Sequence, residues 1–423
     1  MRVLILTIYF DPEPIPKTGE LARELRRRGH EVHVVTAFPH YPSGTLYPGY
    51  RLALWRREVR DGVPILRTFI YPYHGESAAR RILNYLSWMC SSVLASVLTP
   101  PCDVLYVWHP PLTVGVSAWI VSKLKRAPYV YDVQDLWPES ALASGLMKPG
   151  PLVSFLEALA RWVYARAPRI LVVSRSAAEH LMSQGVEKDK LRISKHWIND
   201  APFQRQPSRH VRKELQLGGR FVTMFAGNLG IVQGLETVVE AAAALREHPE
   251  FVFVLVGDGS DRARLEQMVT DRDLTNVIFA GQQPANDMPD FYLAADALLV
   301  HLRPSLIGEH AIPTKVVAYL AAGRPIICAS GAAAVEVVRQ ADAGLTVEPG
   351  DSAGIVEAVR NLAARPEVER KSLGERGRRF FQLNFRRDTV INEYEEILRE
   401  LATASPSDRS ATKGSVREPS TRN

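Results

Sequence analysis

A glycine-rich turn near the middle of the chain has the residue types of an anion-binding site. Residues 227–234 read GNLGIVQG; they follow a buried strand pattern and precede a helical one. Glycines let a ligand approach the backbone closely, and the free amides at a helix start attract anions. We therefore expect Gly227, Asn228, Gly230 and Gln233 to bind a phosphate-bearing ligand, the alternative being a simple strand-to-helix turn.

Two cations further along the chain suit the same ligand. Arg303 lies just after a strand pattern, and Lys315 opens the helical pattern over residues 316–322, which Gly323 ends. The helix dipole opposes a cation at this position unless an anion lies nearby, and such a local conflict is typical of functional sites. We expect both cations to contact the ligand, although a solvated surface side chain is the alternative for Lys315.

The first turn of the chain offers a second anion site. Residues 9–19 read YFDPEPIPKTG and lie between the first strand pattern and the first helical pattern. Lys17, Thr18 and Gly19 supply a cation, a hydroxyl and unhindered amides at a helix start, which suits phosphate. The turn lacks the G-x-G-x-x-G spacing, so a dinucleotide-binding fold is disfavoured. A proline-shaped connection with a solvated lysine is the alternative.

Acidic and aromatic residues follow two later strand patterns. Asp132, Asp135 and Glu139 lie in the segment DVQDLWPES beside Trp137, and His109 ends the preceding strand pattern. Acids beside an indole suit a sugar, whose hydroxyls bind carboxylates while its ring stacks on the aromatic face. We expect Asp135, Glu139 and His109 to be catalytic residues; the alternatives are helix-capping acids, a core tryptophan and a structural histidine.

The composition sets the class of protein. The 423 residues are 46% hydrophobic and 23% charged, which is a globular balance and excludes a disordered or collagen-like chain. Three scattered cysteines form no disulfide framework and fit a reducing compartment. With no spaced set of metal ligands, we expect no metal and no cofactor. The start, MRVLILTIYFDPEP, indicates a buried strand instead of a signal peptide.

Positive charge is concentrated in the first half of the chain. The net charge is +6, and residues 1–200 carry 25 Lys and Arg against 17 Asp and Glu. A basic surface of this kind favours an anionic partner, such as a membrane surface or a phosphate-bearing acceptor, or is an ordinary solvated surface. No basic block with interleaved aromatic residues occurs, so nucleic-acid binding is not expected.

Short β-branched runs alternate with helical patterns along the chain, which predicts an α/β fold with parallel sheets covered on both faces. The pattern restarts after the polar residues 196–207, so we expect two Rossmann-like, doubly wound domains with a cleft between them. The first covers residues 1–200 and the second 201–380. A helix over 381–404 crosses back onto the first domain, and 405–423 form a disordered tail. The expected strands cover residues 3–7, 31–37, 65–71, 104–108, 129–133, 170–173, 221–225, 251–256, 277–280, 297–300, 325–328 and 344–347.

One long segment carries no charge. Residues 82–102 follow Arg80 and Arg81, and their number alone permits a membrane span. Four serines and Asn84 lower the hydrophobicity, and the segment lies between two strands of one expected sheet, which disfavours a span. Two interpretations stay open: a partly buried helix of the fold, or a helix that also dips Trp88 into the bilayer interface.

Motifs in both halves together resemble the family-4 GT-B glycosyltransferases. The narrower likeness is to bacterial O-antigen and exopolysaccharide enzymes of the L-fucosamine-transferase type, and it runs from about residue 2 to residue 401. The motifs are GHEV at 29–32, GTLYPGY at 44–50, WHPPLTVG at 108–115, DVQDLWPES at 132–140, GNLGIVQG at 227–234, VGDG at 256–259 and IPTKVVAYLAAGRP at 312–325.

The resemblance implies a GT-B fold whose C-terminal domain holds a nucleotide-diphospho-sugar donor, with Lys17 reaching that donor across the cleft. It implies transfer with retention of anomeric configuration and no catalytic metal. The polysaccharide branch implies an acceptor glycan on an undecaprenyl-diphosphate carrier, and therefore a peripheral position on the cytoplasmic membrane face. Asp135 and Glu139 would then orient the sugar or the acceptor.

The sequence departs from the wider family at the donor turn. Asn228 and Gln233 stand where many members have an Arg and a Lys, and His310 and Ala318 stand where paired glutamates would fall. Other cations must therefore bind the diphosphate in this chain, and Lys315 is the candidate. On the acceptor side, a glutamine replaces a histidine that is often found there.

A non-catalytic nucleotide-sugar-binding subunit of a polysaccharide assembly complex is the alternative function. Against it, the glycines of the donor turn and Lys315 would be superfluous. A nucleotide-sugar epimerase is disfavoured by the missing G-x-G-x-x-G and Tyr-x-x-x-Lys patterns.

Overall fold

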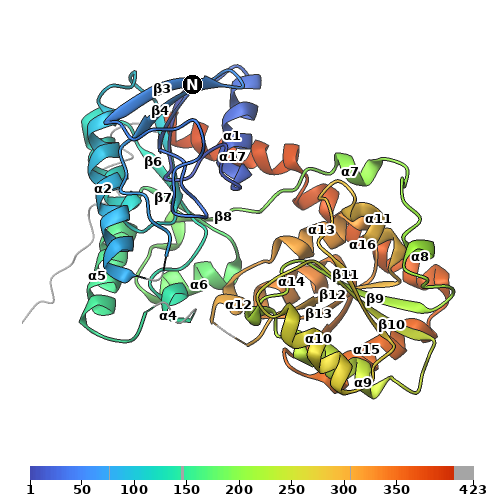
Figure 1. The fold of residues 1–423 in the computed structure, drawn as a ribbon. Helices are drawn as coiled ribbons and strands as arrows, with labels where there is room; N and C mark the ends of the chain where they lie inside the picture. The colour runs from blue at the N-terminus through green and yellow to red at the C-terminus, as the bar shows by residue number, and fades with distance from the viewer. Residues whose placement is uncertain (76, 144–146, 305, 404–423) are drawn as a thin grey trace, which may run out of the picture. The chain divides into compact units, whose positions relative to one another are not determined.

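The computed structural model describes residues 1–75, 77–143, 147–304 and 306–403, so the predicted tail over 405–423 lies outside the described residues. The chain forms two α/β units (Figure 1). Of the described residues, the first unit comprises 1–172, 180–194 and 391–403, and the second comprises 173–179 and 195–390. The expectation of two Rossmann-like parallel-sheet domains is confirmed.

The first unit contains an eight-stranded sheet in the order β3-β4-β2-β1-β5-β6-β7-β8. Every neighbouring pair is parallel except β3 and β4, which are antiparallel. The strands are β1 (Arg2–Leu6), β2 (Glu31–Ala37), β3 (Trp55–Arg60), β4 (Val63–Thr68), β5 (Val104–His109), β6 (Tyr129–Val133), β7 (Arg169–Val172) and β8 (Leu191–Ile193). The main helices are α1 (Pro16–Arg27), α2 (Ala78–Ser96), α3 (Thr113–Lys125), α4 (Glu139–Ala143) and α5 (Pro151–Arg166).

The second unit contains a six-stranded parallel sheet in the order β11-β10-β9-β12-β13-β14. Its strands are β9 (Phe221–Ala226), β10 (Phe251–Val256), β11 (Val277–Gly281), β12 (Ala297–His301), β13 (Ile326–Ala329) and β14 (Gly344–Val347). Successive residues of β10 enter opposite cores: Val252 and Val254 pack on one face, and Phe253 and Leu255 on the other. This two-sided burial explains why the strand is apolar throughout.

Helices cover both faces of the second sheet. The helices of this unit are α7 (Ala201–Gln204), α8 (Val211–Glu214), α9 (Glu236–Ala244), α10 (Arg262–Asp271), α11 (Met288–Ala294), α12 (Leu306–His310), α13 (Thr314–Ala322), α14 (Ala332–Ala341), α15 (Ser352–Ala364) and α16 (Glu367–Asn384). Helix α6 (Arg175–Ser183) and helix α17 (Arg387–Thr403) contribute residues to both units.

Helix α2 accounts for most of the uncharged segment, and within the described residues no helix has the length and hydropathy needed to cross a membrane. Trp88 is fully buried, so of the two interpretations the one in which it dips into the bilayer interface is wrong. It shares the inner face of α2 with Asn84 and Ser92, whose polar atoms bond Tyr71 and Ser117 inside the unit. The helix therefore turns polar side chains inward and leaves leucines outside.

The buried carboxylate of Asp132 joins three segments of the first unit. Its Oδ2 accepts hydrogen bonds from Tyr106 Oη at 2.5 Å and from Tyr394 Oη of α17 at 3.1 Å. Lys17 Nζ of α1 lies 3.3 Å from the same oxygen. Both charges of this pair are removed from water, so removing either partner would leave a costly buried charge.

A second set of contacts holds α17 on the first unit. The carboxylate of Glu395 lies 2.8 Å from Arg28 Nη1 and 3.0 Å from His30 Nε2. Both partners lie where α1 ends and β2 begins. The last helix therefore packs on the first unit through charged groups as well as through buried Tyr394.

We expect Asp132→Asn to destabilise the first unit by about 3–5 kcal/mol, because it strands the ammonium of Lys17 in a dry site. Adding Lys17→Met in that background should recover most of the loss. Urea unfolding followed by tryptophan fluorescence measures both. Asp103→Asn is the control, since its partner Arg2 is exposed and such pairs contribute below about 1 kcal/mol. A cost for Asp132→Asn no larger than the control's would contradict this account.

Candidate functional site

The glycine turn of the second unit lies at a topological switch point. Strand β9 has β10 on one side and β12 on the other, and the chain goes from β9 to β10 before it returns to β12. Ligands of open α/β sheets bind at the carboxyl ends of the strands at this position. The turn after β9 and the residues after β12 both lie there.

Backbone contacts fix the shape of the turn. Gly227 has a φ of +147°, and its amide donates to the carbonyl of Val256 at 2.9 Å. Gly257 packs directly on Gly227, so closely that a Cβ on Gly257 would overlap the Gly227 carbonyl oxygen. The turn and the VGDG segment are thus interlocked, and both require glycine.

The residues after the turn differ from the expectation in one respect. A short 3-10 helix over Ile231–Gln233 follows, and α9 begins only at Glu236. The first turn of α9 therefore carries an acid. Asn228 is exposed, and a Cβ on Gly230 would lie 2.8 Å from its Nδ2, so the amide of Asn228 folds over Gly230.

Lys315 reaches the turn from α13. Its Nζ lies 2.5 Å from Gln233 Oε1 and 3.8 Å from the centre of the Phe225 ring. A Cβ on Gly227 would lie 3.4 Å from the same Nζ. One helical turn further along, Tyr319 Oη accepts from the amide of Ala226 at 2.9 Å and so fixes α13 against the end of β9.

The charge of Lys315 is not balanced by an acid. Among the described residues, no carboxylate lies within 4.0 Å of its Nζ, and burial lowers its pKa to about 7. The ammonium lies in the first turn of α13, where the helix dipole also disfavours a cation. A bound anion would relieve both penalties, so the turn and Lys315 together form a site suited to a phosphate group.

Arg303 lies against the same turn but is paired. Its backbone amide donates to the carbonyl of Val232 at 3.0 Å, and its Nη2 lies 2.5 Å from Glu236 Oε1. Glu236 also binds Arg264 at 2.9 Å. Against the effect of burial, a hydrogen bond from its own backbone amide and the two cations lower the pKa of Glu236. The backbone of Arg303 therefore helps to fix the conformation of the turn, and the charge of its side chain is balanced by Glu236.

The other two expected donor residues, Lys17 and Gly19, lie in the first turn of α1 in the first unit. Lys17 Nζ is held by Asp132 and lies 3.2 Å from Gln134 Oε1 and 5.2 Å from the centre of the Tyr394 ring. Burial lowers the pKa of this lysine, while the carboxylate of Asp132 opposes the change. Lys17 thus differs from Lys315 in having a buried counter-ion.

The expected catalytic residues lie at the ends of β5 and β6, which adjoin. His109 ends β5 and is fully buried; neither ring nitrogen has a hydrogen-bond partner among the described residues, and burial lowers its pKa to about 3. Asp135 is exposed, yet the protein around it raises its pKa by desolvation. Glu139 begins α4, accepts from Gln184 Nε2 at 2.8 Å and lies 3.1 Å from His180 Nε2.

Two residues with strong contacts were not among the residues expected to be catalytic or to bind the donor, although Asp132 was one of the three acids considered for sugar binding. Asp132 organises the core of the first unit, and Glu13 is a buried acid in the first turn. Glu13 stands in a proline-rich turn that the sequence had singled out for Lys17, Thr18 and Gly19, but two of its three hydrogen-bond donors, His40 and Tyr41, come from a distant loop. In the parts of the chain that the structure describes, no three His, Cys, Asp or Glu side chains are grouped to hold a metal ion.

Both units match known families. Residues 15–194 match the glycosyl transferase 4-like domain, and residues 208–380 match glycosyl transferases group 1. WcaI of Escherichia coli strain K12, named as a colanic acid biosynthesis glycosyl transferase, is 30% identical over 342 residues, covering 76% of this chain and 82% of WcaI. The 2-deoxystreptamine N-acetyl-D-glucosaminyltransferase of Streptomyces fradiae is 27% identical over 356 residues, or 75% and 78% of the two chains.

The fold is also found in solved structures. The crystal structure of HepE from Anabaena in complex with UDP aligns with a TM-score of 0.70 at 17% identity, covering 95% of this chain and 100% of HepE. The two sheets and this likeness define a GT-B glycosyltransferase fold. With both domain matches and the relationship to WcaI, the chain belongs to the family-4 GT-B glycosyltransferases, which confirms the resemblance seen in the sequence.

We expect Lys315→Met to weaken the binding of nucleoside diphosphates by about 1.5–3 kcal/mol, or roughly 10- to 150-fold, because one charge-assisted hydrogen bond is lost. Isothermal titration with UDP, GDP and dTDP measures the effect. The fold should survive, since the methionine removes an unpaired charge. Lys371→Met is the matched control, because Lys371 is exposed beside Glu367 on α16. Equal affinities in both variants would exclude the diphosphate role.

The affinity for the same ligands should fall as the pH rises from about 7.5 to 9. With a pKa of about 7 in the free protein, Lys315 must take up a proton in order to bind an anion above that pH. The phosphate groups do not titrate in this window, because their second pKa is about 6. Lys315→Arg should bind with little dependence on pH. A profile that persists unchanged in Lys315→Arg would show that another group titrates.

Proposed function

We propose that this glycosyltransferase moves a hexosyl group from a nucleotide-diphospho-sugar to a glycan on a lipid-diphosphate carrier, with retention of anomeric configuration. The reaction would take place at the cytoplasmic membrane during surface polysaccharide assembly, with undecaprenyl diphosphate as the carrier. The observation that supports it most strongly is the unpaired ammonium of Lys315 against the Gly227 turn.

The chemistry requires stabilisation of a leaving group. As the bond from the sugar to the diphosphate breaks, negative charge grows on the diphosphate, and positive charge grows on the sugar ring. Fixed donors aimed at the growing charge are worth more than the same donors in water. We assign this task to Lys315 and to the backbone amides of Asn228 and Gly230, with the side chains of Asn228 and Gln233 as neutral donors, because the amides of Gly227 and Leu229 already donate to the carbonyls of Val256 and Asp258. No protein base is needed if the leaving phosphate accepts the acceptor's proton.

Two relatives support the class of donor and product. WcaI carries the name of a colanic acid glycosyl transferase, and HepE has been crystallised with UDP-glucose as well as with UDP. A uridine diphosphate sugar is therefore the first donor to examine. On the acceptor side, the exposed carboxylate of Asp135 and the half-buried Glu139 are candidates to orient a sugar hydroxyl.

An exposed apolar stripe on α2 supports a peripheral position at the membrane. Helix α2 exposes Ile82, Leu86, Cys90 and Leu94 at four-residue spacing, and Leu98 follows just beyond the end of the helix at Ser96. Leu94 is 72% exposed. Such a stripe suits insertion into a bilayer interface.

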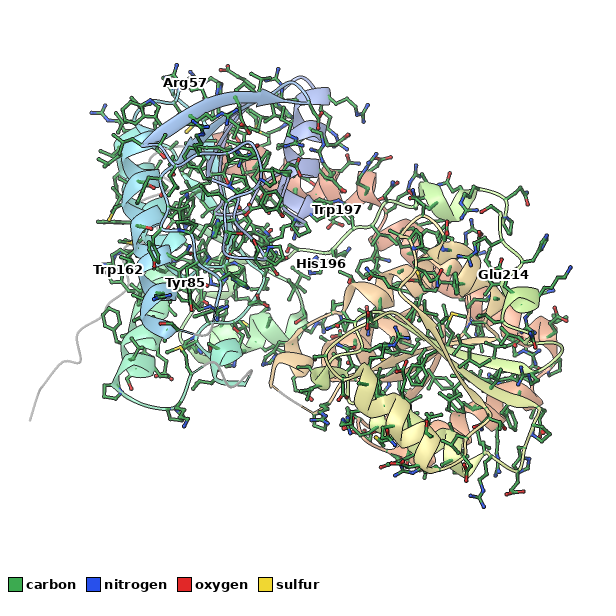
Figure 2. The ribbon with its side chains drawn as sticks, viewed as in Figure 1. Arg57, Tyr85, Trp162, His196, Trp197 and Glu214 are labelled. Carbon is green, nitrogen blue, oxygen red and sulfur yellow. The ribbon has the colours of Figure 1, made fainter. Side chains whose placement is uncertain are left out.

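Cations lie at both ends of this stripe. Arg80 and Arg81 precede it in the first turns of α2. At the other end, Arg57 of β3, labelled in Figure 2, donates to the carbonyl of Leu98, and Lys125 donates to that of Thr99 at 2.5 Å. An apolar face flanked by cations is complementary to an anionic membrane, each cation contributing about 1 kcal/mol.

The proposed reaction is tested by incubating the protein with nucleotide-diphospho-sugars and a synthetic polyprenyl-diphosphate-linked monosaccharide. We expect a disaccharide product whose new bond has the anomeric configuration of the donor, determined by NMR. The rate should not change in EDTA, because the donor turn offers amides and a lysine in place of metal ligands. Binding of donors without transfer or hydrolysis would favour the non-catalytic subunit instead, and an inverted product would refute retention.

Membrane binding is tested by co-sedimentation with vesicles of equal phosphatidylcholine and phosphatidylglycerol at low salt. The double variant Leu86→Glu with Leu94→Glu should remain in the supernatant while the wild type sediments, because both side chains are exposed and contribute only through the bilayer. Leu383→Glu on α16 is the matched control, since Leu383 is 67% exposed. A wild type that stays in solution at low salt would exclude docking through α2.

A further inference from the structure

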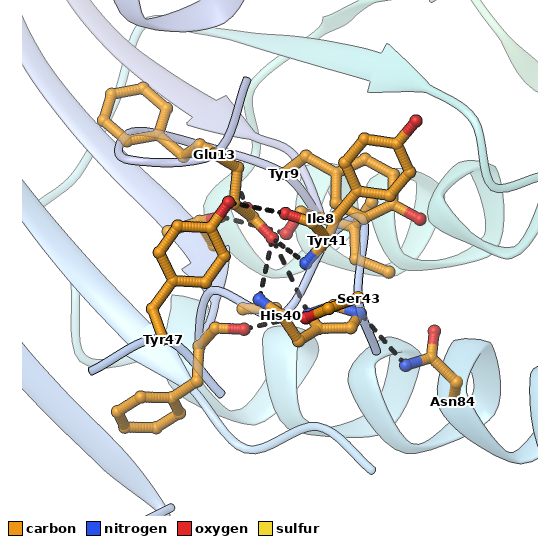
Figure 3. A network of polar contacts seen from close by, with 12 residues as sticks. Ile8, Tyr9, Glu13, His40, Tyr41, Ser43, Tyr47 and Asn84 are labelled. Carbon is orange, nitrogen blue, oxygen red and sulfur yellow. Dashed lines mark hydrogen bonds and ion pairs between the residues drawn. The ribbon is translucent and has the colours of Figure 1, made fainter. Parts of the chain in front are cut away.

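A buried carboxylate ties together two loops at the carboxyl edge of the first sheet (Figure 3). Glu13, in the loop after β1, is 3% exposed. Its Oε2 accepts from the amide of Phe10 at 3.0 Å, and its Oε1 accepts from the amides of His40 and Tyr41, each at 2.9 Å. The last two residues belong to the loop after β2. The carboxylate of Glu13 thus accepts hydrogen bonds from three backbone amides that belong to two different loops.

The contacts continue from His40 to two further segments. The Nδ1 of His40 donates to the carbonyl of Phe38 at 3.0 Å, which leaves its Nε2 free to accept from Asn84 Nδ2 at 3.2 Å. Asn84 lies on α2, and the same amide donates to the carbonyl of Tyr71 at 2.6 Å. The loop after β2 is thereby joined to α2 and to the segment that follows β4.

The joined loops carry a group of aromatic rings. Tyr9 lies under Tyr41 with ring centres 4.9 Å apart, and Tyr41 meets His74 edge-on at 4.8 Å. The rings of Tyr41 and His74 are only half-buried, whereas Tyr9 is 6% exposed. In Figure 3 the rings of Tyr9 and Tyr41 lie together on one side of Glu13. We call Tyr41 and His74, resting on Tyr9, the aromatic platform.

The platform lies at the switch point of the first sheet. Strand β1 is flanked by β2 and β5, and Tyr9 contacts Trp108 of β5 at a ring distance of 6.4 Å. Ligands bind at such points in open α/β sheets. Flat aromatic faces with polar tips suit the alternating C–H faces and hydroxyl edges of a pyranose.

We propose that Glu13 is a positioning residue for the acceptor: its carboxylate holds the loops after β1 and β2 together, so that the aromatic platform can receive a pyranose ring. This inference rests on the proposed function, because it takes the acceptor to be a glycan bound by the first unit. Glu13 itself touches only protein, and it acts through Tyr9 and Tyr41.

Burial raises the pKa of Glu13 to about 7, although its three backbone hydrogen bonds and the cation of Arg67 on β4 favour the ionised form. Burial lowers the pKa of His40 to about 4 and raises those of Tyr9 and Tyr47. Burial also lowers the pKa of His74 in the platform, and the nearby cation of Arg81 adds to this change. A protonated Glu13 has one oxygen that donates, so it serves the three amides less well. Acidification below about pH 7 should therefore loosen the two loops.

The test compares Glu13→Gln with the wild type and with Glu31→Gln, a matched control whose side chain is 50% exposed on β2. The probes are the methyl pyranosides of glucose, galactose, mannose and N-acetylglucosamine, observed by saturation-transfer NMR between pH 6 and 8. We expect the wild type to bind at least one probe and to lose affinity as the pH falls through 7. Glu13→Gln should bind at least fivefold more weakly with no dependence on pH, and Glu31→Gln should resemble the wild type.

Hydrogen exchange separates a positioning role from a structural one. In Glu13→Gln the amides of Phe10, His40 and Tyr41 should exchange faster than in the wild type. If they do so while the affinity for sugar and its pH profile stay unchanged, Glu13 is only structural and the proposal fails. Tyr41→Leu provides a second variant in case Glu13→Gln does not fold: it should abolish binding of the probe while the amides stay protected. A wild type that binds none of the probes would also overturn the proposal.

Titration with UDP distinguishes a failure of the proposed role of Glu13 from a failure of the proposed function. The donor turn lies in the second unit, so Glu13→Gln should bind UDP as the wild type does. A failure of both proteins to bind any nucleoside diphosphate would refute the proposed donor chemistry and leave the sugar result standing by itself.

Discussion

The ion pair of Lys17 and Asp132 is the constraint on which the first unit depends. Asp132 has no contact with water, and it holds β6, α1, the Tyr106 hydroxyl of β5 and Tyr394 of α17 at one point. A charge in such a place is tolerated only when its partners are fixed. The last helix of the chain is one of those partners, so the first unit is complete only when a segment nearly four hundred residues from its start has folded onto it.

Burial lowers the pKa of both Lys17 and Lys315, but the two lysines differ in what balances their charge. Lys17 has Asp132 as a counter-ion and serves the fold, whereas the contacts that the structure describes for the Lys315 ammonium are the neutral Gln233 and the face of Phe225. Arg303, a third cation close to the donor turn, is matched by Glu236. Lys315 differs from the other two cations because no carboxylate lies beside it in the described part of the chain, and burial lowers its pKa to about 7.

Local patterns in the sequence predicted most of the fold. Strands β6, β10 and β14 were expected at their observed bounds. The clearest case is β10, FVFVLV, because a strand buried on both faces is an uninterrupted apolar run. Strand β3, WRREVR, was missed, since it is an exposed edge strand held by pairing with β4 alone. The sequence left open whether Trp88 enters the bilayer, and the structure excludes this because α2 buries Trp88 together with asparagine and serine and exposes leucine. Which face of a helix is buried depends on tertiary contacts that its own sequence does not carry.

The sequence likewise located the turns of the candidate sites but not the partners of their charged side chains. The glycine turn was visible because the strand, the turn and the following helix are continuous in the chain. The acceptor of the Lys315 hydrogen bond lies 82 residues away, and two of the three amides bound by Glu13 lie 27 and 28 residues away. Parallel sheets bring successive loops to one edge, so side chains with no sequence relationship must meet there. The turns could therefore be located from the sequence, whereas the pairing of each charged group, which decides whether it serves the fold or a ligand, required the structure.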